Sequence, residues 1–202
     1  MNFLAHIYLS GNDKVIKIGN FMADGIRGKD YENYLPKLKV GILLHRFIDS
    51  YTDSHPIFRQ STKRLHHNYN HYSGVLVDMF YDHFLCKNWK QYSAENLSDF
   101  VDNFYASLRE NYKILTDKTQ YLLPYMEQGN WLYNYQFLDK LEVILSQMDN
   151  RIKNESKMRY AITDLKQYYS EFENEFTLFF EDIRQAAQAK LKQLLLESNV
   201  NL

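Results

Sequence analysis

Apolar side chains recur every three or four positions through much of the second half of the chain. In residues 93–108 these positions are Leu97, Phe100, Val101, Phe104 and Leu108, and Ser93 stands where a helix cap is expected. This period predicts an amphipathic helix. It also predicts helices over residues 134–149 and about 157–198, with no glycine or proline after Gly129 to interrupt them. Because no segment alternates strictly between apolar and polar residues, we expect an all-α fold.

Glycine and proline divide the first 90 residues into shorter helices. The pattern predicts helices up to about residue 9 and over residues 15–22, 37–52, 57–68 and 74–88. Gly25, Gly28 and Pro36 separate the second of these helices from the third, and His55-Pro56 ends the third. Farther along, Pro124 with Gly129 and then residues 150–156 are predicted to connect helices.

Composition indicates one domain spanning residues 1–202. The chain has 202 residues, of which 45% are hydrophobic, enough for a large single core. A net charge of −1 gives no overall positive charge for nucleic acid, and no apolar run reaches the roughly 18 to 20 residues of a membrane span. The single cysteine, Cys86, excludes an intramolecular disulfide and favours a cytoplasmic location.

All seven histidines lie in the first 83 residues, and some of them have acids at helical spacing. His45 and Asp49 are four residues apart, as are Asp78 and Asp82, with His83 directly after. Residues four apart share one helix face, about 5 to 6 Å between Cβ atoms. Two carboxylates on the largely apolar helix 74–88 would need a cation or an arginine to neutralise them. A metal site is therefore expected in the N-terminal half.

The alternative is that these residues have no functional role. A single Asp and His pair at helical spacing is more often a surface or capping feature than a ligand pair. His66, His67 and His71 stand in a polar stretch, and His55 precedes a proline. We assign these four histidines to helix ends or to the surface.

Four runs of residues together resemble the acyl carrier protein phosphodiesterase family. They are Asn2-Phe-Leu-Ala-His6, Gly19-Asn-Phe-Met-Ala-Asp-Gly-Ile-Arg-Gly28, Gly41-Ile-Leu-Leu-His-Arg-Phe-Ile-Asp-Ser-Tyr-Thr-Asp53 and Asp78-Met-Phe-Tyr-Asp-His-Phe-Leu85. The resemblance covers about residues 1–90, and residues 91–202 are expected to be a helical scaffold. Gly25 departs from the family pattern, in which an aromatic or other large residue is expected.

This resemblance implies an all-helical, single-domain bundle, distantly similar to the HD-type metal-dependent phosphohydrolases. The implied reaction removes the 4'-phosphopantetheine group from holo acyl carrier protein with a divalent cation, typically Mn²⁺. Carboxylates and imidazoles without a thiolate also suit Mn²⁺, Fe²⁺ or Mg²⁺ better than a structural zinc. By motif, the resemblance implies the metal ligands Asp24, His45, Asp49, Asp82 and His83. It also implies that His6 and Asp78 either bind the metal themselves or contact a residue that does.

Catalytic and partner-binding roles are predicted for several basic residues. His6 is the candidate for protonating the leaving group, and Arg27 and Arg46 are candidates for holding the phosphodiester. An acidic carrier protein is expected to dock on the bases near the site, at Arg59, Lys63 and Arg64.

Two other functions stay open at this point. One is an HD-type phosphohydrolase that acts on a nucleotide or another small phosphoester. The other is a non-enzymatic helical module that binds a metal. The sequence leaves the oligomeric state open.

Overall fold

The computed structural model describes residues 1–153 and 155–199, and within them the regular structure is entirely helical. The predicted all-α fold is therefore confirmed for this part of the chain. The α-helices are α1 (Phe3–Leu9), α2 (Lys14–Met22), α3 (Pro36–Ser54), α4 (Pro56–Tyr69), α5 (Ser73–Lys87), α6 (Trp89–Tyr92), α7 (Leu97–Glu110), α8 (Asp117–Gln128), α9 (Trp131–Asn134), α10 (Leu138–Arg151), α11 (Ala161–Gln167) and α12 (Tyr169–Glu197). Short 3-10 turns lie at η1 (Ala23–Gly25), η2 (Asp30–Asn33), η3 (Asn70–Tyr72), η4 (Tyr112–Ile114) and η5 (Met158–Tyr160).

Local chemistry sets the helix boundaries in the N-terminal half. The Asp13 carboxylate accepts hydrogen bonds from the Val15 and Ile16 amides and so caps α2. Pro36 and Pro56 stand at the first positions of α3 and α4, where the missing N–H costs nothing. His55, with ψ 130°, separates α3 from α4. The predicted interruption before Pro56 is confirmed.

Two predictions about connections are wrong in part. Pro124 lies inside α8, where Thr119, Leu123 and Met126 are buried and hold that helix against the core, whereas Gly129 ends α8 as predicted. The predicted helix over residues 157–198 is divided at Tyr168 into α11 and α12. The two helices pack on different neighbours: α11 lies against α10, whereas α12 runs along α3. No glycine or proline marks that change of direction.

Other boundaries differ less from the prediction. Ser93 does not cap α7; its hydroxyl accepts from the Glu95 amide in the preceding turn, and Asn96 is the cap residue. The predicted connection over residues 150–156 follows the end of α10 at Arg151, although residue 154 lies outside the described residues.

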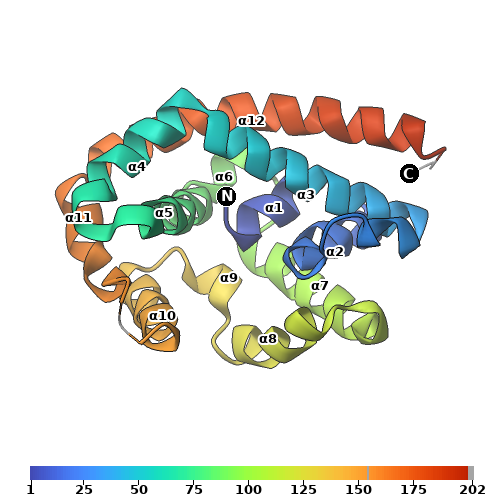
Figure 1. Cartoon of the computed structure of the whole chain (residues 1–202), viewed down its shortest axis with the longest axis horizontal. Helices are drawn as coiled ribbons and strands as arrows, with labels where there is room; N and C mark the ends of the chain where they lie inside the picture. The colour runs from blue at the N-terminus through green and yellow to red at the C-terminus, as the bar shows by residue number, and fades with distance from the viewer. Residues whose placement is uncertain (154, 200–202) are drawn as a thin grey trace.

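The long helix α12 lies along one side of the molecule beside α3 and α4, while α8 and α10 lie on the opposite side, with α1 and α5 between (Figure 1). Four phenylalanines of α12 are fully buried, and α5 is buried around most of its circumference. Among the described helices, none combines the length and apolar character of a membrane span, as the sequence predicted.

Candidate metal centre and its pocket

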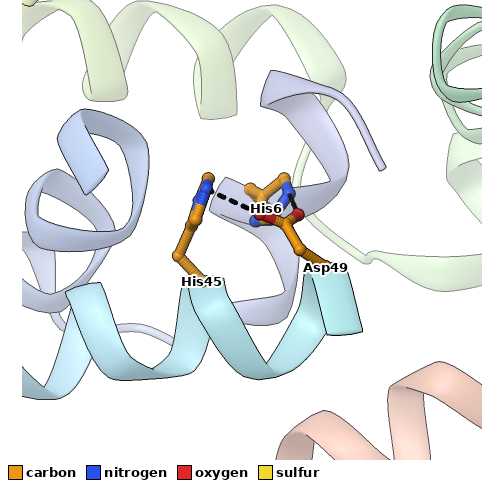
Figure 2. A group of neighbouring side chains, drawn as sticks. All are labelled: His6, His45 and Asp49. Atoms are coloured by element: carbon orange, nitrogen blue, oxygen red, sulfur yellow. Dashed lines mark ion pairs between the residues drawn. The ribbon is translucent and has the colours of Figure 1, made fainter. Parts of the chain in front are cut away.

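His6, His45 and Asp49 meet at one point, although α1 carries the first and α3 the other two (Figure 2). The Nε2 atom of His6 lies 3.1 Å from one Asp49 oxygen, and Nε2 of His45 lies 3.0 Å from the other. The two imidazole rings are stacked, with centroids 4.2 Å apart. One atom from each residue can be chosen so that all three lie within 4.8 Å of one another. This grouping has the size of a metal coordination site.

Asp24, in η1, adds a second carboxylate to the cluster. Its Oδ1 atom is 3.2 Å from Nε2 of His45, and its Oδ2 atom is 3.4 Å from the ammonium of Lys118, in α8. The Lys118 side chain was not singled out in the sequence, because nothing distinguishes one lysine at the start of a surface helix. Gly25 follows directly, and a Cβ there would collide with the Thr116 side chain. Gly25 therefore lets η1 pack against the start of α8.

Burial and ion pairing shift the pKa values of the two histidines in opposite directions. Burial lowers the pKa of His6 to about 4, although Asp49 opposes the shift. Burial also acts to lower the pKa of His45, but hydrogen bonds to Asp24 and Asp49 outweigh it and raise the pKa to about 9. The hydrogen bond from His45 lowers the pKa of Asp24 to about 2. At neutral pH a protonated His45 therefore bridges two carboxylates.

The cluster lies in the wall of a pocket of about 600 Å³. The N-terminal half contributes Asp53 and Asp78 to its polar side. The second half, which was expected to be scaffold, contributes much of the remaining wall. Its lining residues are Lys118, Tyr121, Leu122, Trp131, Tyr135, Ile144, Met148 and Arg151. The pocket thus combines a compact polar centre with a long apolar wall, which is typical of small-molecule sites.

The structure does not bring Asp82 and His83 into the cluster. The two Asp82 oxygens accept from the Leu4 and Ala5 amides at 2.7 and 3.2 Å, so this buried carboxylate caps the start of α1. His83 is also buried; its Nδ1 contacts the Tyr135 carbonyl oxygen and its Nε2 contacts the Tyr169 hydroxyl, each at 2.8 Å. Both predicted ligands have structural partners instead.

Asp78 lies nearer the site without joining it. It lines the pocket, and its Oδ1 atom is 2.7 Å from the backbone nitrogen of Met1. His55 contacts Asp182 at 3.3 Å, and His66, His67 and His71 are exposed. The positions of these four histidines agree with the helix ends and surface to which the sequence assigned them.

The arginines predicted to hold a phosphodiester do not line the pocket. Arg46 donates to the Gly28 and Ile26 carbonyl oxygens at 2.7 and 3.2 Å and lies over the Tyr31 ring, so it fixes the loop after η1. Arg27 is exposed in that loop. Lys118 and Arg151 line the pocket instead, and of these two Lys118 lies beside Asp24.

The donor set fits a divalent cation. Two imidazole nitrogens and a bidentate-capable carboxylate, with Asp24 beside them, are ligand types that divalent transition-metal ions accept. Three protein ligands that face an open pocket would also leave positions for water and substrate, as catalytic sites require. A bound cation would take the place of the proton that His45 shares with the two carboxylates.

Comparison with known proteins identifies one family over most of the chain. The family model described as acyl carrier protein phosphodiesterase matches residues 1–183. Proteins of that name from Yersinia enterocolitica and Pectobacterium atrosepticum are 28% and 29% identical over 191 residues, which are 94% of this chain and 99% of each relative. The protein of that name from Salmonella agona is 31% identical over 195 residues, 96% of this chain and all of the relative. No solved structure matches, and the likeness to HD-type phosphohydrolases stays a prediction.

Proposed function

The chain belongs to the acyl carrier protein phosphodiesterase family, and from this premise we propose that it hydrolyses the phosphodiester that joins 4'-phosphopantetheine to a serine of acyl carrier protein. The products are apo carrier protein and free 4'-phosphopantetheine. The observation that carries the proposal is the His6, His45 and Asp49 cluster in the wall of the 600 Å³ pocket. The family match extends beyond residue 90 and so includes α8 and α10, which line the same pocket.

We assign the metal to this cluster, with Mn²⁺ preferred and Mg²⁺ or Fe²⁺ as alternatives. His6, His45 and Asp49 would hold it, and Asp24 is close enough to take part. When bound, such a cation activates water and neutralises charge on phosphoryl oxygens. His6 fits the role of ligand better than that of general acid. With a pKa of about 4, its ring is neutral at neutral pH and is not protonated to act as an acid.

The chain's own residues would bind the two ends of the substrate differently. Lys118 places an ammonium beside Asp24 and can balance the negative charge of the phosphodiester. The apolar side chains of Phe3, Leu122 and Met148 offer packing for the aliphatic parts of the pantetheine arm and exclude water from the polar centre. Arg46 contributes indirectly, because it holds the loop that follows Asp24.

The direct test is to incubate the protein with holo carrier protein and Mn²⁺ and to measure loss of phosphopantetheine by mass spectrometry. His45→Gln and Asp49→Asn should each reduce turnover at least about a hundredfold, because each removes a ligand. His71→Gln is the matched control: it alters an exposed histidine in η3 that lines neither the pocket nor the α4 surface, and it should leave turnover unchanged.

The same assay separates the alternatives. If the protein hydrolyses nucleotides in a parallel panel but does not hydrolyse holo carrier protein, the result would favour the hypothesis of an HD-type phosphohydrolase. Stoichiometric Mn²⁺ binding without turnover of any phosphoester would favour a non-enzymatic module. Full turnover by His45→Gln would remove the cluster from the reaction.

A further inference from the structure

Asn20 is a fully buried polar residue of α2 to which the reaction outlined above gives no role. Its side chain lies against both histidines of the cluster. The Oδ1 atom is 2.9 Å from Nδ1 of His6 and 3.1 Å from Nδ1 of His45. The Nδ2 atom lies 3.2 Å from the His6 carbonyl oxygen and 2.8 Å from the Ser10 hydroxyl. One amide therefore contacts both rings on the side away from Asp49.

The partners of this amide fix which of its ends is the oxygen. The His6 carbonyl oxygen can only accept a hydrogen bond, so the NH₂ end of Asn20 must face it. The Ser10 hydroxyl already donates to the same carbonyl oxygen at 2.8 Å, which leaves the hydroxyl oxygen to accept from Asn20. The Asn20 oxygen consequently faces the two imidazoles, and it can only accept.

An accepting oxygen determines where each ring carries its proton. Both His6 and His45 must donate from Nδ1 to Asn20, which one carbonyl oxygen can accommodate through its two lone pairs. In a neutral imidazole with the proton on Nδ1, the free lone pair is on Nε2. Both Nε2 atoms face the Asp49 carboxylate, at 3.1 and 3.0 Å. With His45 deprotonated, as metal binding requires, the two lone pairs converge where a cation would be held.

We propose that Asn20 is the positioning residue of the metal centre: a single amide oxygen holds His6 and His45 in the Nδ1–H form and aims both Nε2 atoms at one cation. This inference rests on the proposed metal site. Hydrogen bonds from ligand imidazoles to a second group commonly orient metal ligands, and removing that group typically costs 10- to 100-fold in metal affinity. Here one residue serves two ligands that come from different helices, α1 and α3.

Three variants test the proposal. Asn20→Leu keeps the approximate volume but removes the acceptor, and should weaken Mn²⁺ binding about 10- to 100-fold. Asn20→Asp keeps an acceptor for both Nδ1–H groups, and should retain more of the Mn²⁺ affinity than Asn20→Leu. Ser10→Ala is the matched control, because it removes a neighbour of the same amide while the bond from Nδ2 to the His6 carbonyl oxygen stays. Its Mn²⁺ affinity should match that of the wild type.

Two readouts avoid any dependence on the substrate. Mn²⁺ dissociation constants are measured by electron paramagnetic resonance of the free ion, and ring protonation by long-range ¹H–¹⁵N spectra of protein loaded with diamagnetic Zn²⁺. The wild type should show Nδ1–H at both histidines, and Asn20→Leu should show Nε2–H at one of them or a ring released from the metal. An incorrect substrate assignment would leave these measurements unaffected.

The spectra and the Mn²⁺ affinities can each overturn the proposed role of Asn20. Wild-type spectra with Nε2–H at His6 or His45 overturn the proposal, as does an Asn20→Leu protein that keeps wild-type affinity and both Nδ1–H signals. If circular dichroism shows that Asn20→Leu does not fold, the wild-type spectrum and the comparison of Asn20→Asp with Ser10→Ala carry the test. Equal losses of affinity in Asn20→Asp and Ser10→Ala would then count against it.

Discussion

At the scale of single residues, His45 holds a proton between two acids in the metal-free protein. Its side chain is only 10% exposed, yet Asp24 and Asp49 keep it charged. Burial alone would favour the neutral ring, as it does at His6. The two stacked imidazoles therefore have opposite charge preferences although they share one amide and one carboxylate.

This difference predicts a pH dependence for the stability of the metal-free protein. The pKa of His45 in the fold is about 9, above its ordinary value of 6.5, so protonation stabilises the folded state. That contribution is complete below pH 6.5 and is lost as the pH rises through 9; its size is at most about 3 kcal/mol. Urea unfolding in a chelator at pH 6.5 and 9.5 measures the loss. His45→Gln should show a smaller loss, and an equal loss would contradict the assignment.

Only part of the site could be predicted from the sequence. His45 and Asp49 are four residues apart on one helix, so their proximity follows from helical geometry. The direction in which Asp82 and His83 point could not be predicted, because α5 is apolar on nearly every side and its pattern does not single out one buried face. Asn20 gave no signal, since a buried amide acts through contacts that only the tertiary structure creates.

At the scale of helices, α2 and α3 cross with their backbones in close contact. A Cβ at Gly19 would collide with the Leu38 carbonyl oxygen, and one at Gly41 with the Ile16 carbonyl oxygen. Two glycines thus let the two backbones touch. This contact sets Asn20 and Asp24 at hydrogen-bonding distance from His45. The helix periods predicted both elements, but the sequence alone did not show that their glycines face each other.

Gly41→Ala should therefore separate α2 from α3. We expect a loss of about 1 to 3 kcal/mol or more in unfolding free energy, because backbone atoms cannot move aside as a flexible side chain would. Weaker Mn²⁺ binding should accompany it. Gly74→Ala in α5 is the control: an added Cβ there meets nothing within 4 Å, and alanine should be neutral or slightly stabilising. If Gly41→Ala and Gly74→Ala have equal unfolding free energies in urea, the contact between α2 and α3 accommodates an added Cβ and this prediction is wrong.

At the scale of the whole molecule, the pocket is built by both halves of the chain. The α8–α10 wall supplies apolar positions such as Leu122, Trp131 and Ile144, which in the sequence look the same as core positions. Periodicity predicted that these residues would be buried but could not show that they face a cavity. A second, shallow hollow on α4 shares Asp53 with the pocket and is bordered by four exposed basic or imidazole side chains, those of Arg59, Lys63, His66 and His67.

This hollow is where an acidic carrier protein should dock. Arg64, which the sequence placed in the same surface, is bound to Glu175 through two hydrogen bonds of 2.6 and 2.7 Å and has an internal partner. The docking surface is therefore restricted to Arg59, Lys63 and their exposed neighbours. Because the net charge of the chain is −1, attraction of an acidic partner must come from such a local surface.

Reversing both charges, with Arg59→Glu and Lys63→Glu together, should weaken binding of holo carrier protein about tenfold at low salt. The difference from wild type should shrink in high salt, where the Debye length falls to about 3 Å at 1 M. Lys90→Glu with Lys192→Glu is the charge-matched control, since these exposed lysines line neither the pocket nor the hollow. Surface plasmon resonance over a salt series separates the cases. A control pair that weakens binding as much would mean that net charge, and not the α4 surface, governs docking.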